Sequence, residues 1–135
     1  MAVPSVSPAR SRNMALIRSK DTAPEIAVRR QLSAAGFRFR LHDPGTPGRP
    51  DLVIRNCKLA VFVDGCFWHG CPRHYTRPHV RRAYWDAKLR RNRDRRSRIL
   101  RELASEGWTS VEIWECEVKA GPDHWLPRVA RAVLH

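Results

Sequence analysis

The fold is decided by residues 47–74, which read PGRPDLVIRNCKLAVFVDGCFWHGCPRH. The stretch starts in a loop rich in proline and glycine, where no regular element can form. Two apolar segments follow, 52–55 and 58–64, with a turn near Asn56, and this pattern predicts a β-hairpin. The second segment contains LAVFV, which is apolar on both faces, and we therefore expect it to lie in the centre of a sheet.

Helices and further strands are predicted on both sides of this hairpin. Upstream, Thr22 is the expected N-cap of a helix, and the alternating residues 37–40 that follow it predict a strand. Downstream, residues 79–105 have the pattern of a long helix and residues 109–115 that of a strand, and Asp123 is the expected cap of a final helix. Strands bracketed by helices through short loops predict an α/β domain with a mixed β-sheet flanked by helices.

Length, charge and hydropathy limit the class of protein. The chain has 135 residues, which suits one domain, and we expect a disordered, proline-rich leader at 1–10 followed by a single domain at 11–135. Hydrophobic residues make up 42%, enough for a packed core. The longest apolar run, 59–63, has five residues, and the N-terminus lacks the apolar core of a signal peptide. The expected location is therefore the cytoplasm, with no membrane contact.

Positive charge is concentrated in the predicted long helix. The formal net charge is +13, and residues 73–101 hold twelve Lys or Arg against two acids, Asp86 and Asp94. A basic helix binds the phosphates of a duplex by releasing their counterions, so nucleic acid is the expected partner. The alternative is a solvated helix face, but so few acids leave the repulsion without internal pairing. The inward face of this helix is predicted to carry Trp85, Leu89, Asn92, Arg96, Leu100 and Leu103.

Aromatic side chains flank the basic region. They are Phe67, Trp68, Tyr75, Tyr84 and Trp85. Because Phe67 and Trp68 are adjacent in a loop, where two neighbours seldom face one core, at least one of them is expected to stack on bases or wedge between them. The alternative for each aromatic is an ordinary place in the core.

Thiolate and imidazole side chains predict a zinc site. The expected ligands, three from one loop and one from the end of a remote strand, are Cys66, Cys71, His74 and Cys116. Tetrahedral zinc is commonly held by such a combination. His69 and His79 are alternatives to His74. A different interpretation is that the thiols are simply buried, as unligated cysteines often are.

Acidic residues of the hairpin predict a site for a catalytic metal. Asp51 precedes the first strand and Asp64 ends the second, so the hairpin brings the two carboxylates together. Carboxylates with a backbone carbonyl, such as that of Val63, are oxygen ligands suited to Mg²⁺, which can activate water against a phosphodiester. His69 is the candidate general base. The alternative for Asp51 is a residue that caps a turn.

With these residues in place, the sequence resembles the very-short-patch repair (Vsr) endonucleases of bacteria, which are DNA mismatch nickases related to restriction enzymes. The motifs that carry the resemblance are RSRNMALIRSKDTAPE at 10–25, PGRPD at 47–51, VFVDGCFWHGCPRH at 61–74 and GW…WECE at 107–117. The resemblance therefore covers roughly residues 10–118. It implies a restriction-endonuclease-like α/β core with a structural zinc.

The resemblance also implies roles for individual residues. Asp51 matches the family's metal-binding aspartate, the carbonyl of Val63 completes the Mg²⁺ shell, and His69 matches the general base. Glu25 matches an acid near the scissile site, although Thr22-x-x-Glu25 also fits a capping box, and the two roles are compatible. The zinc ligands fall on Cys66, Cys71, His74 and Cys116, and the aromatics that wedge into DNA on Phe67, Trp68 and Trp85.

The sequence departs from the family pattern at two positions and in the spacing of its zinc loop, so that His74 is the least secure of the four zinc ligands. The best-known members have His where this chain has Asp64, and many have an Asp where counting four residues from Asn92 gives Arg96. That Asp orients the general base. Here either the helix register shifts toward Asp94, or Asp64 orients His69, or His69 acts without an orienting acid.

Taken together, the residues and the resemblance predict a monomeric, Mg²⁺-dependent endonuclease. By resemblance, it nicks double-stranded DNA 5′ of the T in T:G mispairs, the products of 5-methylcytosine deamination, and mismatch-repair proteins are candidate partners. One rival is a zinc-stabilised DNA-binding module without catalysis, which the basic helix and the cysteines alone support equally well. A second rival is a restriction or structure-specific nuclease on the same core.

Overall fold

The computed structural model describes residues 22–66 and 78–134, and its centre is a four-stranded sheet. The strands are β1 (Arg40–Leu41), β2 (Leu52–Ile54), β3 (Leu59–Asp64) and β4 (Thr109–Trp114), and they lie in the order β1-β2-β3-β4. The β1–β2 and β2–β3 pairs are antiparallel, whereas β3 and β4 run parallel. The predicted mixed sheet is therefore confirmed.

The hairpin predicted from residues 52–64 is present. The turn is a short 3₁₀ helix, η1 (Arg55–Cys57), followed by Lys58 in the left-handed conformation with φ 52°. In the resulting register, Leu52 lies opposite Val61. Because β3 pairs with β2 on one side and β4 on the other, it is an inner strand, as its apolar sequence predicts.

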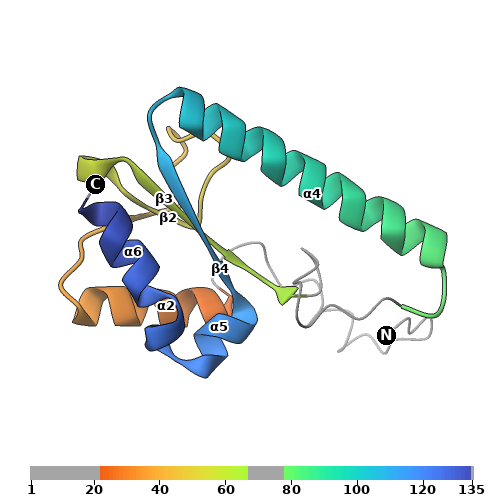
Figure 1. Ribbon diagram of the computed structural model, residues 1–135, viewed down its shortest axis with the longest axis horizontal. Helices are drawn as coiled ribbons and strands as arrows, with labels where there is room; N and C mark the ends of the chain where they lie inside the picture. Colours follow the sequence, from red (N-terminus) through yellow and green to blue (C-terminus); the bar gives the residue numbers. More distant parts are fainter. Residues whose placement is uncertain (1–21, 67–77, 135) are drawn as a thin grey trace.

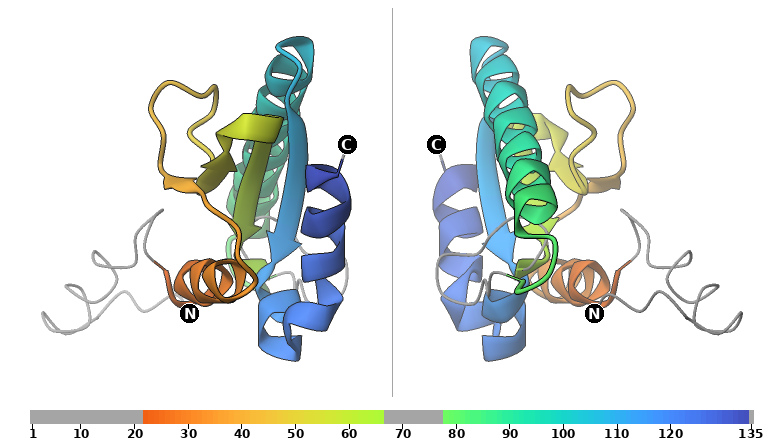
Figure 2. Two further views of the ribbon diagram at one scale, coloured as in Figure 1. Left: turned by 90° about the vertical axis from the view of Figure 1, so that its left-hand side faces the viewer. Right: turned by 90° about the vertical axis from the view of Figure 1, so that its right-hand side faces the viewer.

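Helices cover both faces of the sheet (Figures 1 and 2). The long helix α4 (Arg82–Ser105) crosses one face. The opposite face carries α2 (Ala23–Ala34), α5 (Glu115–Ala120) and α6 (Leu126–Val133), with the 3₁₀ helix η2 (Pro122–His124) between the last two. No described helix is long and apolar enough to cross a membrane.

The two apolar faces of β3 serve two different cores. Leu59 and Val61 belong to a core that includes buried residues of α2 and α6. Ala60 and Phe62 belong to a second core with Leu103 of α4. Successive side chains of a strand point to opposite faces, so a strand that is covered on both sides must be apolar at every position. This is the physical reason for the unbroken run LAVFV.

The C-terminal elements differ from two expectations. Glu115 begins α5 instead of ending β4, and this places Cys116 in a helix and not at the end of a strand. The predicted cap at Asp123 is wrong, because Asp123 lies within η2 and the residue before α6 is Trp125. The chain makes a separate 3₁₀ turn that begins at Pro122, which delays the last helix. The predicted leader at 1–10 lies outside the described residues.

Candidate active site

Asp51 directly precedes β2 and is held at one end of the sheet by hydrogen bonds. Its carboxylate Oδ2 accepts a hydrogen bond of 2.6 Å from the backbone N–H of Val63, in β3. Its carbonyl oxygen accepts one of 3.2 Å from the backbone N–H of His42, which directly follows β1. Three neighbouring strands therefore position Asp51, and the predicted closeness of Asp51 to the end of β3 is confirmed.

Glu25 and His42 lie beside Asp51. One potential ligand atom from each of the three side chains lies within 4.8 Å of the other two. Glu25 reaches this point from the first turn of α2 and is only 1% exposed. Its backbone N–H donates to the side-chain oxygen of Thr22, the N-cap residue, at 3.4 Å. Glu25 therefore takes part in the cap through its backbone while its carboxylate faces the cluster.

Two arginines near Asp51 form ion pairs with the neighbouring acids Glu25 and Asp64 and not with Asp51 itself. Arg29 pairs with Glu25, one helical turn away on α2. Arg96 of α4 grips both oxygens of Asp64, at 2.6 and 2.8 Å. Within residues 22–66 and 78–134, no Lys or Arg forms an ion pair with Asp51. Of these three acids, Asp51 is therefore the one without an ion pair to a described Lys or Arg.

Burial and like charge act strongly on Asp51. Desolvation is the main cause that raises the pKa of its carboxyl group to about 7, and the charges of Glu25 and Asp64 raise it further. The hydrogen bond from Val63 opposes this shift. A carboxylate that is costly to ionise alone, beside a second carboxylate and an imidazole, suits a divalent cation, whose charge favours the ionised form. Glu25, Asp51 and His42 are thus the described residues that can hold a metal.

Asp64 and Arg96, the two positions that depart from the family pattern, are in direct contact. Arg96 also donates to Glu112 of β4 at 2.8 Å, and its guanidinium carbon lies 4.1 Å from the centre of the Phe62 ring. Its side chain is 15% exposed, so the predicted inward position of Arg96 on the long helix is confirmed. Asp94, by contrast, is exposed. The helix therefore presents Arg96 to the site and not the neighbouring acid.

Several predicted site residues fall outside the described part of the chain. They are the general base His69, the aromatics Phe67 and Trp68, and the zinc ligands Cys71 and His74. The other two predicted zinc ligands are described and partly buried, Cys66 just after β3 and Cys116 in α5. Trp85 lies on α4 with its ring edge-on to that of Tyr84, 5.1 Å between centroids. The zinc site and the wedge stay predictions.

His42 is the site residue that sequence reasoning missed. It and Asp51 flank the proline-rich loop 43–50, so both come together once that loop folds back on itself. Asp43 organises the loop by accepting hydrogen bonds from the backbone of Gly45 and the hydroxyl of Thr46. The bond from Gly45 is the main cause that lowers the pKa of Asp43. The sequence could have indicated His42 by its position, because a histidine and Asp51 stand at the two ends of a loop whose ends must meet.

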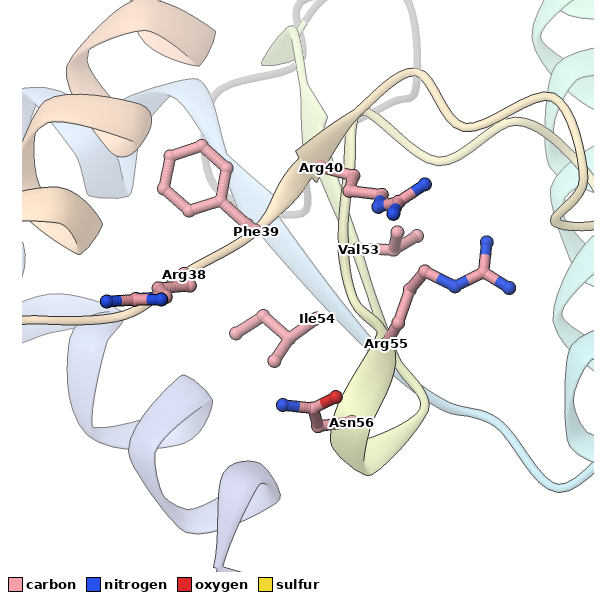
Figure 3. Close-up of a pocket in the computed structure, with 7 residues that line it drawn as sticks. All are labelled: Arg38, Phe39, Arg40, Val53, Ile54, Arg55 and Asn56. Carbon is pink, nitrogen blue, oxygen red and sulfur yellow. The ribbon is translucent and has the colours of Figure 1, made fainter.

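A separate pocket lies toward the other end of β2. Its cavity volume is about 220 Å³, and its lining residues, shown in Figure 3, are Arg38, Phe39, Arg40, Val53, Ile54, Arg55 and Asn56. The guanidinium groups of Arg40 and Arg55 extend to the same side of the strands. None of the clustered acids lines this pocket, so it is distinct from the candidate active site.

The fold and the site define an α/β protein with an acidic cluster at one end of a mixed sheet and a strongly basic helix beside it. The family model described as DNA mismatch endonuclease Vsr matches residues 6–75. The chain is 46% identical over 118 residues to the type II nicking enzyme V.XorIIP of Xanthomonas oryzae pv. oryzae, covering 84% of this chain and 85% of the relative.

Two further relatives agree with that match. The type II nicking enzyme V.NaeI of Lentzea aerocolonigenes is 43% identical, with 80% of this chain and 68% of the relative covered. The DNA mismatch endonuclease Vsr of Escherichia coli K12 is 35% identical, with 82% and 71% covered. The chain belongs to the Vsr family of DNA mismatch endonucleases, and the resemblance in its motifs is confirmed.

Proposed function

We propose that this protein is a Mg²⁺-dependent endonuclease that nicks one DNA strand 5′ of the T in a T:G mispair. The observation that carries the proposal is the partly buried Asp51 carboxylate, clustered with Glu25 and His42 and without a Lys or Arg ion pair among the described residues, in a chain of the Vsr family. A restriction-endonuclease-like core is in keeping with a mixed sheet that has its acids at one end.

The proposal assigns roles to the acids of this site and to the residues beside them. Asp51 and Glu25 would hold the cation, with the carbonyl of Val63 as a further oxygen ligand. A bound Mg²⁺ would supply positive charge to stabilise the transferring phosphate and would favour ionisation of water. His69 accepts the proton from the attacking water, and the hydrogen bond from Val63 keeps the Asp51 carboxylate turned toward β3. Arg96 holds Asp64, the residue proposed to orient His69.

DNA is held by α4 in this proposal. Exposed arginines line the outer side of the helix, namely Arg82, Arg90, Arg91, Arg93, Arg95, Arg98 and Arg101. This concentration of exposed cations on one helix favours contact with the phosphates of a duplex. Phe67, Trp68 and Trp85 enter the stack beside the mispair, where unstacking costs less than at a paired step.

A structural Zn²⁺ is proposed on Cys66, Cys71, His74 and Cys116. Two of these ligands come from different parts of the described chain, Cys66 from the end of β3 and Cys116 from α5. A tetrahedral ion there would tie the chain that follows β3 to α5.

The substrate is tested with matched duplexes that differ at one base pair. A T:G duplex, the corresponding T:A and C:G duplexes and the other mismatches are each incubated with the full chain and Mg²⁺, in several flanking sequences, and the nick is mapped. We expect at least about tenfold faster nicking 5′ of T in T:G than in the paired duplexes. Equal nicking of paired DNA would contradict mismatch specificity and favour a restriction-type nickase, and several relatives are named type II nicking enzymes.

A further inference from the structure

His42 is held in the acidic cluster by its backbone as well as by its side chain. It adopts a left-handed conformation with φ 48°, which residues other than glycine rarely take, and its N–H donates to the carbonyl oxygen of Asp51. Unusual backbone conformations of this kind collect at functional sites, where the surrounding structure enforces them. The histidine is thereby fixed next to Asp51.

The Nε2 atom of His42 has two contacts that make opposite demands. It lies 3.1 Å from Oε2 of Glu25 and 3.1 Å from Nη2 of Arg29. Hydrogen bonding to the carboxylate requires a hydrogen on Nε2, whereas hydrogen bonding to the guanidinium, which can only donate, requires a lone pair there. Nη2 of Arg29 contacts both Nε2 of His42 and Oε2 of Glu25, so a cationic group already lies against the imidazole nitrogen and the carboxylate.

From this geometry we infer that His42 is a nitrogen ligand of the active-site cation, together with the carboxylates of Asp51 and Glu25. The inference rests on the proposed function and deepens it, because it names a third side chain in the metal site. A bound cation would accept the Nε2 lone pair of His42 and would pair with the Glu25 carboxylate, so that the two side chains would no longer need a hydrogen between them.

A mixed set of oxygen and nitrogen ligands has consequences for the choice of metal. Carboxylates and water suit Mg²⁺, whereas an imidazole raises the affinity for transition-metal ions in the order in which Mn²⁺ is followed by Fe²⁺ and Co²⁺. The site of this chain is therefore expected to bind Mn²⁺ more tightly than Mg²⁺, and His42 is the residue expected to cause the difference.

The direct test is pulsed EPR of Mn²⁺ bound to the full chain without DNA. A directly coordinated imidazole couples its ¹⁴N nucleus to the electron spin. We expect this coupling in the parent and in His124→Gln, a control at an exposed histidine of η2, and its loss in His42→Gln. Retention of the coupling in His42→Gln, or its absence from the parent, would overturn the inference.

Affinities measured by calorimetry supply a second readout. His42→Gln should weaken Mn²⁺ binding at least about tenfold and Mg²⁺ binding much less, since only the nitrogen ligand is lost. Arg29→Gln should act in the opposite direction and tighten the binding of both ions, because it removes a competing positive charge from Glu25. Equal losses for Mn²⁺ and Mg²⁺ in His42→Gln would contradict a ligand role.

The same measurements separate this inference from the proposed function. If Mn²⁺ binds, depends on Asp51 and shows no ¹⁴N coupling, the metal site stands and the role of His42 is wrong. If the parent and Asp51→Asn bind Mn²⁺ equally, the metal site itself is wrong.

Discussion

A single carboxylate, that of Asp51, carries most of the chemistry assigned to this protein. The neighbouring acids each pair with an arginine, Glu25 with Arg29 and Asp64 with Arg96, whereas Asp51 has no Lys or Arg ion pair among the described residues and accepts a hydrogen bond from the backbone N–H of Val63. Burial and two nearby negative charges therefore raise its pKa to about 7. A divalent cation bound at this point would favour the ionised form of the Asp51 carboxyl group.

The pKa of Asp51 predicts a pH-dependent stability difference in the absence of divalent cations. Because the folded-state pKa lies above the usual value of 3.8, folding favours the protonated form, and this stability is lost as the pH rises toward 7. Asp51→Asn, which cannot ionise, should therefore be more stable than the parent by about 2 kcal/mol at pH 8, and by clearly less at pH 5. Urea unfolding at both pH values measures this, and a difference that does not change with pH would contradict it.

The long helix α4 is attached to the sheet by a charged contact as well as by apolar packing. Arg96 lies over Phe62 and pairs with Asp64 at the end of β3 and with Glu112 of β4. It therefore fixes the basic helix relative to the strand that also carries Val63. At this scale Arg96 is a positioning residue, since it acts on the site through Asp64.

Removal of Arg96 should destabilise the fold more than removal of its exposed neighbour. Arg96→Met leaves Asp64, which is 3% exposed, as a buried charge without this partner, and we expect a loss of about 3 kcal/mol in the free energy of unfolding. The control Arg95→Met, on the exposed side of α4, should change it by less than about 0.5 kcal/mol.

The second variant needed is Asp64→Asn/Arg96→Met, which removes both charges of the pair. It should recover part of the stability lost in Arg96→Met, because no buried carboxylate then remains without its arginine. Equal stability of Arg95→Met and Arg96→Met in urea unfolding would show that the contact does not hold the helix.

Sequence patterns predicted the elements better than the contacts between them. The hairpin at 52–64 and the helix at 82–105 follow from local periodicity, and both are present. The start of α5 at Glu115 was missed because no proline or glycine separates it from β4. His42 and the Asp64–Arg96 pair were missed because they depend on loop closure and on residues 32 positions apart, which local patterns do not report.

At the scale of the whole molecule, negative charge gathers at one end of the sheet and positive charge on the helix α4. The acids Glu25, Asp51 and Asp64 gather where β2 begins and β3 ends, while the exposed side of α4 carries a row of arginines. In the account proposed here, the helix attracts the DNA backbone and the acidic end, neutralised by a cation, meets the scissile phosphate.

This division predicts how salt affects DNA binding. Replacing Arg90 and Arg98, both exposed on α4, by Gln should weaken binding to any duplex and lower the slope of log K against log salt concentration by about 1 to 2. The control Arg131→Gln changes an exposed arginine on α6, across the sheet, and should leave the slope unchanged. Fluorescence anisotropy at several salt concentrations measures both. A slope that falls equally in both would place the DNA elsewhere.

Asp51 is proposed to hold the cation that makes this chain a nuclease. The most direct measurement compares the parent, Asp51→Asn and Asp123→Asn, a control at an exposed acid of η2, in nicking a T:G duplex at saturating Mg²⁺. We expect Asp123→Asn to match the parent, and Asp51→Asn to lose at least about a hundredfold in nicking rate while still binding the duplex. Nicking by Asp51→Asn at the parental rate would contradict the account.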